Sequence, residues 1–289
     1  MIGFGMTGQT GHTSLNLNST KQQGNLLMFG KISKISALTL VVSSLAGGAA
    51  VADTLIVGAN IGNVPWEFQD ESGAFVGFEV DLVNAVAEKL GRDVEIVNIP
   101  FNGLFSAVQS GRIEVAMSSI TITDARLESV TFAQPYYDSD QSLTVVSGGP
   151  IDLKDMNEKV VGVDTGSTGD MWATENTGDV GFSDIKRYEG LSPAMLDLAA
   201  GRIDGYISDI PALLYYVKDK PNLSVVQRIE TGEKYSMMFA KDAPLAVEVN
   251  DILTGLKEEG VISELHEKWF GAVPEATTST VMVLDMPKL

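Results

Sequence analysis

The sequence predicts an α/β fold made of two lobes, each an open and mostly parallel sheet flanked by helices. In both halves of the chain, short apolar segments alternate with longer segments whose apolar residues recur every three or four positions. This alternation is typical of β-α-β units. A short motif also occurs twice, because Gly111-Arg112-Ile113-Glu114 is matched by Gly201-Arg202-Ile203-Asp204. Two copies of one strand unit indicate two similar lobes that face each other.

The first lobe begins with the apolar run Thr54–Ala59, which predicts a buried strand. From Phe78 to Leu90, apolar residues lie three or four positions apart and Gly91 follows them, so this stretch predicts an amphipathic helix with a glycine stop. The pattern continues with a strand over 94–98, a helix over 103–110 and a strand over 113–117. This β-α-β-α-β order is that of an open, mostly parallel sheet.

The second lobe repeats the pattern, and the chain then returns to the first. Expected elements of the second lobe are strands over 141–147, 160–163, 181–185 and 203–207 and helices over 170–176 and 193–200. A strand over 235–240 re-enters the first lobe, and helices over 244–259 and 262–270 close it. We therefore expect two extended crossings, near 138–143 and 232–238. The first lobe comprises residues 53–140 and 235–289, including a tail from 271, and the second lobe comprises residues 141–234.

The first 52 residues have the composition of a removable leader. A short basic segment over 28–34 precedes a mostly apolar run over 35–46, and Ala50-Val51-Ala52 forms an A-x-A site. This layout is typical of a secretory signal peptide with cleavage before Asp53, and the apolar run is too short to span a membrane. Residues 1–27 are interpreted as an upstream extension; the alternative is a structured N-terminal helix.

Composition argues against several classes of function. The formal net charge of −18 gives a surface that repels nucleic acid and gains nothing from anionic lipids. The chain has no cysteine, which removes disulfides, thiolate nucleophiles, Cys-ligated metals and a lipid-modified cysteine. Because His12 lies in the leader, a Ser-His-Asp triad or a multi-histidine metal site would have to be built on His266 alone. We expect no metal, no cofactor and no hydrolytic chemistry.

Polar side chains gather where the two repeated strands end. Ser118, Ser119, Thr121 and Arg126 follow the first copy, and Asp209 matches Ser119 in the register of the second copy. Ligands of open α/β sheets bind outside the carboxyl ends of the strands. The planar fork of Arg126 suits a carboxylate, with Ser119 and Thr121 as further donors, whereas Asp209 suits an ammonium group. The pattern indicates a site for a small zwitterion between the lobes.

The two charged residues also have ordinary structural interpretations. If Thr123 caps a helix that begins at Asp124, Arg126 lies in its first turn, where a lone arginine is most often exposed. Asp209 precedes Ile210-Pro211 and a helix, so a plain N-cap is the simpler interpretation of that residue alone.

One turn and two aromatic residues have a similar ambiguity. The turn Gly166-Ser167-Thr168-Gly169 precedes a helix and offers backbone N–H groups to an anion, but Ser167 or Thr168 can simply cap that helix. Phe101 is interpreted either as core or as an apolar wall of the site. Trp66 is expected to pack within its lobe rather than stack on a ligand.

Six segments, spread over nearly the whole mature chain, resemble the family 3 extracellular solute-binding proteins, the periplasmic receptors of polar amino-acid ABC importers. They are VGFEVDLVNAVAEKLG (76–91), FNGLFSAVQSGRIEVAMSSITITDAR (101–126), FAQPYY (132–137), VGVDTGSTGD (161–170), LAAGRIDGYISD (198–209) and ELHEKWFG (264–271). The resemblance implies a type II periplasmic-binding-protein fold with two hinge crossings. It also implies a monomer in the periplasm that takes up a small-molecule amino acid and delivers it to an inner-membrane ABC permease.

The resemblance further implies a role for each residue of the site. Arg126 would hold the ligand α-carboxylate with Thr121 and Thr168, and Ser119 and Asp209 would hold the α-ammonium group. Four positions would surround the ligand side chain, with Phe101 as a wall and Asn60, Asn63 and Ser118 in contact with it.

Two departures from the family pattern bear on specificity. The family usually carries an aromatic residue where Asn63 stands, and many relatives that bind cationic or amide side chains have an acid where Asn60 stands. Two amides in these places suggest a polar or neutral ligand, or one with extra acceptor groups.

We expect a receptor rather than an enzyme. The rival on the same fold is a periplasmic dehydratase resembling cyclohexadienyl or arogenate dehydratase, which needs a general acid such as Glu67, Asp170 or Glu175. A third interpretation is a receptor for an opine or a compatible solute such as ectoine, which would keep the carboxylate site and weaken the role of Asp209.

Overall fold

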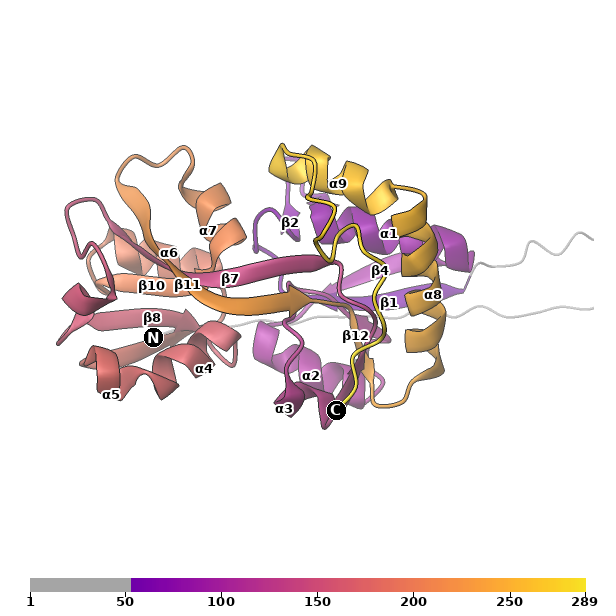
Figure 1. Ribbon diagram of the computed structural model, residues 1–289, viewed down its shortest axis with the longest axis horizontal. Helices are drawn as coiled ribbons and strands as arrows, with labels where there is room; N and C mark the ends of the chain where they lie inside the picture. Colours follow the sequence, from indigo (N-terminus) through magenta and orange to yellow (C-terminus); the bar gives the residue numbers. More distant parts are fainter. Residues whose placement is uncertain (1–52) are drawn as a thin grey trace, which may run out of the picture. The chain divides into compact units, whose positions relative to one another are not determined.

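The computed structural model describes residues 53–289, and the expected signal peptide with its cleavage site lies outside the described residues. Two five-stranded sheets organise this part of the chain, in the orders β4-β1-β5-β12-β6 and β11-β7-β10-β8-β9 (Figure 1). We call the regions around them the first and the second lobe. In each sheet three neighbouring strands are parallel and the remaining pairings are antiparallel.

The strands of the first sheet are β1 (Thr54–Ala59), β4 (Asp93–Asn98), β5 (Val115–Ala116), β6 (Val130–Phe132) and β12 (Met238–Ala240). Beside it lies a small hairpin of β2 (Phe68–Gln69) and β3 (Phe75–Val76). The strands of the second sheet are β7 (Tyr137–Val146), β8 (Val160–Asp164), β9 (Asp184–Tyr188), β10 (Gly205–Asp209) and β11 (Leu223–Tyr235).

Helices cover both faces of both sheets. On the first sheet, α1 (Phe78–Leu90), α8 (Pro244–Glu258) and α9 (Val261–Phe270) pack on one face, and α2 (Phe101–Gln109) packs on the other, near the short α3 (Asp124–Leu127). On the second sheet, α4 (Thr168–Glu175), α5 (Thr177–Val180) and the 3-10 helix η1 (Leu153–Met156) face α6 (Leu191–Ala199) and α7 (Ile210–Val217) across the strands. Each lobe is therefore a three-layer α/β/α unit with its own apolar core.

Two long strands connect the lobes. β7 and β11 pair antiparallel from Val146 with Leu223 to Tyr137 with Tyr235, so β7 carries the chain from the first lobe into the second and β11 carries it back (Figure 1). The expected crossings, 138–143 and 232–238, fall on this ribbon and its continuation into β12. The expected lobe limits after residues 140 and 234 also fall within these two strands.

Several boundaries differ from the sequence prediction for identifiable reasons. The strand expected over 181–185 is β9 at 184–188, because Gly181 adopts a left-handed conformation (φ 83°) and ends α5. Helix α2 begins at Phe101 rather than Gly103. Strand β11 was missed over most of its length. It is an edge strand with mixed polar and charged residues, so it lacks the alternation that marks a half-buried strand.

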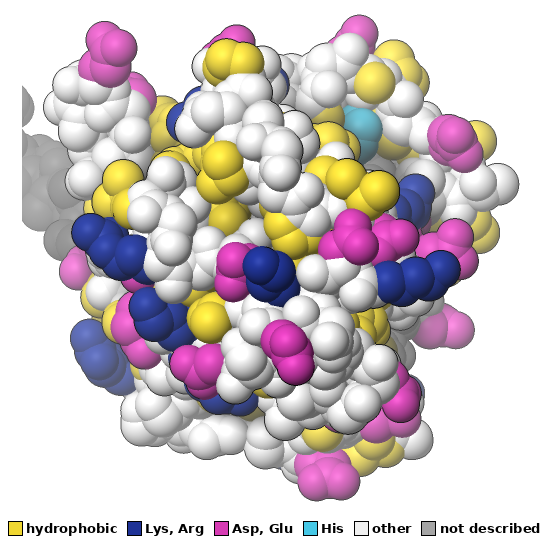
Figure 2. All heavy atoms as spheres, turned by 90° about the vertical axis from the view of Figure 1, so that its left-hand side faces the viewer, with side chains coloured by type: hydrophobic (Ala, Val, Ile, Leu, Met, Phe, Trp, Pro, Cys, Tyr) yellow, Lys and Arg dark blue, Asp and Glu magenta, His cyan; other side chains and the backbone are white. Residues whose placement is uncertain are grey.

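The surface of the second lobe carries charges of both signs despite the acidic composition. Figure 2 views the molecule from this end, and basic and acidic side chains lie interspersed on it. Ion pairs in this lobe include Arg202 with Asp197 (2.6 Å) and Arg187 with Asp170 (2.9 Å). Among the described residues, no helix combines the length and the apolar character needed to cross a bilayer.

The tail after α9 packs against the antiparallel ribbon of β7 and β11, which we call the hinge ribbon. The backbone N–H of Ser279 donates to Asp138 Oδ2 at 2.7 Å, and Lys257 Nζ donates to Met282 O at 2.8 Å. Lys257 is 6% exposed and also donates to Gln134 Oε1 (2.8 Å) and Pro135 O (2.7 Å). Burial lowers its pKa to about 8. One ammonium group thus joins α8, the loop before β7 and the tail.

Replacing Lys257 by Met is expected to lower the free energy of unfolding by about 2–4 kcal/mol, because buried carbonyl oxygens lose their donor. Urea denaturation followed by circular dichroism measures the change. The matched control is Lys89→Met, which breaks an exposed ion pair with Glu259 and is expected to cost less than about 1 kcal/mol. Equal losses in the two variants would refute a structural role for Lys257.

Candidate functional site

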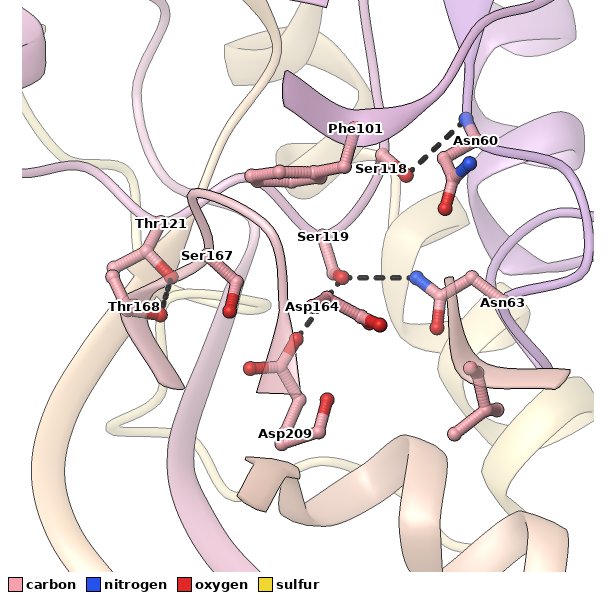
Figure 3. Close-up of a pocket in the computed structure, with 12 residues that line it drawn as sticks. Asn60, Asn63, Phe101, Ser118, Ser119, Thr121, Asp164, Ser167, Thr168 and Asp209 are labelled. Atoms are coloured by element: carbon pink, nitrogen blue, oxygen red, sulfur yellow. Dashed lines mark hydrogen bonds between the residues drawn. The ribbon is translucent and has the colours of Figure 1, made fainter. Parts of the chain in front are cut away.

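A small polar cavity lies between the two lobes, at the ends of their strands (Figure 3). Its volume is about 30 Å³, which accommodates a water molecule or two but no amino acid, so the cleft is nearly closed. The first lobe contributes Asn60, Asn63, Phe101, Ser118, Ser119 and Thr121, and the second contributes Asp164, Ser167, Thr168, Leu191, Ser208 and Asp209. Eight of the nine predicted site residues belong to this lining, and the ninth, Arg126, lies directly behind Thr121.

Arg126 is 5% exposed, so the interpretation as a surface arginine is wrong. Thr123 caps α3 as expected, accepting from the backbone N–H of Arg126 at 3.2 Å. The guanidinium carbon lies 5.4 Å and 5.2 Å from the ring centroids of Phe101 and Phe105. Nη1 donates to Thr121 O at 2.6 Å and Nη2 to Gly166 O, across the cleft, at 3.1 Å. Burial lowers the pKa of Arg126 to about 10.

The carboxyl group of Asp209 points into the cavity. Asp209 precedes α7, but its side chain makes no capping hydrogen bond, so the N-cap interpretation is wrong. Oδ2 accepts from Ser119 Oγ of the first lobe at 3.1 Å, and Oδ1 accepts from Gln141 Nε2 at 2.6 Å. Burial, and then the charge of Glu233, raise the pKa of Asp209 to about 8. A bound cation would offset the energetic cost of burying this negative charge.

Sequence reasoning missed two residues of this network, Gln141 and Glu233, which come from the two strands of the hinge ribbon. Glu233 is 6% exposed and accepts from Thr121 Oγ1 at 2.8 Å and from Gln141 Nε2 at 2.9 Å. Gln141 Nε2 also lies 3.3 Å from Thr168 Oγ1. Glu233 lies in a polar stretch without hydrophobic periodicity, so no sequence pattern indicated that it belongs to the site.

Four contacts hold the lobes together around the cavity. Two of them are the hydrogen bonds described above, from Arg126 to Gly166 O and from Ser119 to Asp209. In the third, the hydroxyl oxygens of Thr121 and Thr168 are 3.4 Å apart. In the fourth, Asn60 Nδ2 donates to Glu189 O at 3.4 Å. Ser167 accepts from the backbone N–H of Asp170 at 3.1 Å. Helix α4 is therefore capped by Ser167, as in the simpler interpretation.

The amide groups of Asn60 and Asn63 line another part of the cavity. Asn63 Nδ2 donates to Ser119 Oγ at 3.0 Å, and the backbone N–H of Asn60 lies 3.4 Å from Ser118 Oγ. Trp66 is fully buried among Phe78, Tyr137 and other aromatic rings of the first lobe, which confirms its expected role in packing.

Two buried carboxyl groups, those of Glu67 and Glu79, accept hydrogen bonds from Ser118 and Ser119. Ser118 Oγ donates to Glu67 Oε1 at 2.5 Å, and the backbone N–H of Ser119, whose φ is 44°, donates to Glu79 Oε1 at 2.8 Å. Tyr136 also donates to Glu79 Oε1. The second oxygen of each carboxyl group has no donor among the described residues.

A proton shared between the two carboxyl groups would supply the missing donor. Burial, and then the charge of Glu79, raise the pKa of Glu67 well above its ordinary value of 4.5. Burial also raises the pKa of Glu79, but the donors around Glu79 oppose that rise. Burial thus favours a protonated state of this pair, since one proton between the two groups lowers the cost of burying both.

None of the three acids considered for a dehydratase lines the cavity. Glu67 is buried beneath Ser118, and Asp170 accepts from Arg187 Nε at 3.0 Å. Glu175 is exposed on α4. His266, in α9, stacks on Tyr137 and does not line the cavity. The described residues contain no cluster of acidic and histidine side chains that would hold a metal ion.

Two α/β lobes joined by a hinge ribbon and closed over a polar cavity define a class of ligand-capturing proteins. Residues 55–272 match the bacterial extracellular solute-binding proteins, family 3. The chain belongs to this family. Its members are extracellular or periplasmic and bind amino acids that they deliver to ABC transporter permeases.

Individual relatives agree with this assignment. A probable histidine-binding protein of Neisseria gonorrhoeae is 33% identical over 222 residues, or 74% of this chain and 82% of that protein. An ancestral arginine-binding protein bound to arginine has a TM-score of 0.72 at 35% identity, covering 75% of this chain and 98% of that one. An ancestral amino-acid-binding protein, a precursor of cyclohexadienyl dehydratase, has a TM-score of 0.69 at 32% identity, covering 75% and 95%. These structures confirm the two-lobed fold expected from the sequence.

The carboxyl pair makes stability depend on pH. A carboxyl group whose pKa rises on folding binds its proton more tightly in the folded protein, so the free energy of unfolding falls as pH rises above 4.5. Glu67→Gln replaces the proton-bearing carboxyl with a permanent donor. As pH rises above 4.5, its stability relative to the wild type is expected to rise by up to about 1.4 kcal/mol per pH unit.

Urea titrations at several pH values, without ligand, measure this difference. The control is Glu71→Gln, which makes the same charge change at an exposed position. Wild-type and Glu67→Gln curves that stay parallel over the whole range would exclude the shared proton.

Proposed function

We propose that this protein captures a zwitterionic amino acid between its lobes and delivers it to an ABC permease of the inner membrane. The observation that carries the proposal is the placement of the buried guanidinium of Arg126 and the half-buried carboxyl group of Asp209 around one small cavity between the lobes. Opposite charges at opposite ends match the two ends of an α-amino acid. The names of similar proteins, which bind histidine or arginine, support the same class of ligand.

In this proposal Arg126 binds the α-carboxylate with help from Thr121 and Thr168. The guanidinium already lies behind both hydroxyl groups, and its Nε is buried without an acceptor among the described residues. A fork that offers parallel N–H donors binds a carboxylate in a bidentate manner.

Ser119 and Asp209 bind the α-ammonium group. The hydrogen bond between them in the closed cleft is the contact that an ammonium group would replace, because it can donate to both oxygens at once. Phe101, Ser118, Asn60 and Asn63 then surround the ligand side chain.

We also infer that the protein is a receptor and not a dehydratase. The acids that the sequence offered as general acids lie outside the cavity lining. Incubation with prephenate or arogenate is expected to return both compounds unchanged, whereas catalytic turnover would overturn this part of the proposal. The likeness to a precursor of cyclohexadienyl dehydratase makes the assay worthwhile.

Arg126→Ala is expected to weaken amino-acid binding by about 30-fold or more, because a buried charge on the ligand would lose its partner. The wild type is first screened by thermal shift against all common amino acids, opines and ectoines, since a ligand of the folded state raises the melting temperature. Isothermal titration calorimetry with the best ligand then compares the variants. Arg187→Ala is the control, because Arg187 pairs with Asp170 outside the cavity. Unchanged affinity in Arg126→Ala would refute the carboxylate site.

A further inference from the structure

One carboxyl group of the cavity has no role in holding the zwitterion. Asp164 ends β8 and lines the cavity from the second lobe, and its Oδ1 is buried without a donor among the described residues. In Figure 3 its side chain reaches into the same space as those of Asn63 and Asp209. An acceptor left in this state inside a binding cavity is costly unless a ligand supplies the donor.

The protein itself offers Asp164 little compensation. The hydroxyl of Tyr206 lies close enough to oppose the effect of burial, but the pair does not reach hydrogen-bonding geometry, and that hydroxyl is also without a partner. Burial, and then the charge of Glu189, raise the pKa of Asp164 to about 7. No lysine, arginine or histidine belongs to the described cavity lining.

Asp164 lies at the end of the cavity where the amides are. Its neighbour in β9 is Tyr188, and the next residue, Glu189, accepts from Asn60 Nδ2 across the cleft. In Figure 3 Asp164 lies between Asp209 and Asn63, on the Asn63 side of the cavity, whereas Thr121 and Thr168 lie on the other side. Arg126 is assigned to the α-carboxylate and Asp209 to the α-ammonium group, so Asp164 faces what the ligand carries beyond these groups.

The charges around the cavity have the same implication. Asp164, Asp209 and Glu233 place three carboxyl groups around it, against the single guanidinium of Arg126. A neutral zwitterion adds one charge of each sign and leaves this excess of acid unchanged. A ligand with one further positive charge reduces it, and buried charges are tolerated only when they are paired.

We propose that Asp164 accepts hydrogen bonds from a positively charged ligand side chain and makes the protein selective for cationic amino acids. This inference rests on the proposed function, since it needs the zwitterion to be held by Arg126 and Asp209. It replaces the polar or neutral ligand that Asn60 and Asn63 alone suggest, because Asp164 brings an acid to the cavity from the opposite lobe.

The test compares charged ligands with their neutral isosteres. Calorimetry measures arginine against citrulline and lysine against norleucine, each with the wild type, Asp164→Asn and Glu189→Gln. In the wild type the charged member of each pair is expected to bind more tightly. Asp164→Asn is expected to weaken arginine and lysine by about 10- to 100-fold, the range for a hydrogen bond to a charged group, and to change citrulline and norleucine by less than about 3-fold.

The two remaining arms separate the possible failures. Glu189→Gln removes an exposed charge next to Asp164 and is expected to leave every affinity within about 3-fold. If this variant loses as much affinity as Asp164→Asn, the effect comes from the negative charge of the whole region, and the assignment to Asp164 is overturned. If Asp164→Asn weakens charged and neutral ligands alike, or the wild type prefers citrulline and norleucine, the inference fails while the proposed function holds. If the wild type binds no amino acid, the proposed function itself fails.

Discussion

The guanidinium group of Arg126 is held between the two lobes by carbonyl oxygens, Thr121 O on its own side and Gly166 O on the other. Two phenylalanine rings cover it, and the carboxyl groups of Asp209 and Glu233 lie near enough to support its charge. A charge in such surroundings is stable only while these partners stay in place. The position of α3, the turn before α4 and the hinge strands all follow from this requirement, and a ligand carboxylate would enter an arrangement that is already built.

The acids around the cavity have different tasks because their surroundings differ. Glu67 accepts from the hydroxyl of Ser118, and Glu79 accepts from the backbone N–H of Ser119, whose φ is positive. Asp209 is linked to the hinge through Gln141, whereas Asp164 has no such support. Acidic side chains thus brace the serines and, in our proposals, also bind an ammonium group and determine specificity. Composition alone cannot distinguish these uses.

Much of the architecture was predictable because it depends on local periodicity. The strand Thr54–Ala59 and the helix Phe78–Leu90 were predicted with their observed limits, and the strand-exit motif led to Arg126, Ser119 and Asp209. What could not be predicted depends on contacts between distant segments. Glu233 lies in an edge strand without a hydrophobic pattern, and Glu79 sits in an amphipathic helix where its burial depends on Tyr136 and Ser119. In the sequence, Asp164 is simply the polar end of a buried strand. Its place in the cavity depends on the first lobe lying opposite it, which the sequence pattern does not show.

The attachment of the tail to the ribbon restricts where the molecule can bend. Ser279 and Lys234 both bind Asp138, so the first-lobe end of β7 and β11 is fastened. Farther along, the pairing is interrupted between Ile229 and Glu233, where Asp140 accepts from the backbone N–H groups of Thr231 and Gly232. A rotation axis through this interruption passes close to Gln141 and Glu233. Displacement grows with distance from the axis, so the carboxylate end of the cleft opens least and the corner of Asn60 and Glu189 opens widest. The ligand side chain would then be the last part to be enclosed and the first to meet solvent on release.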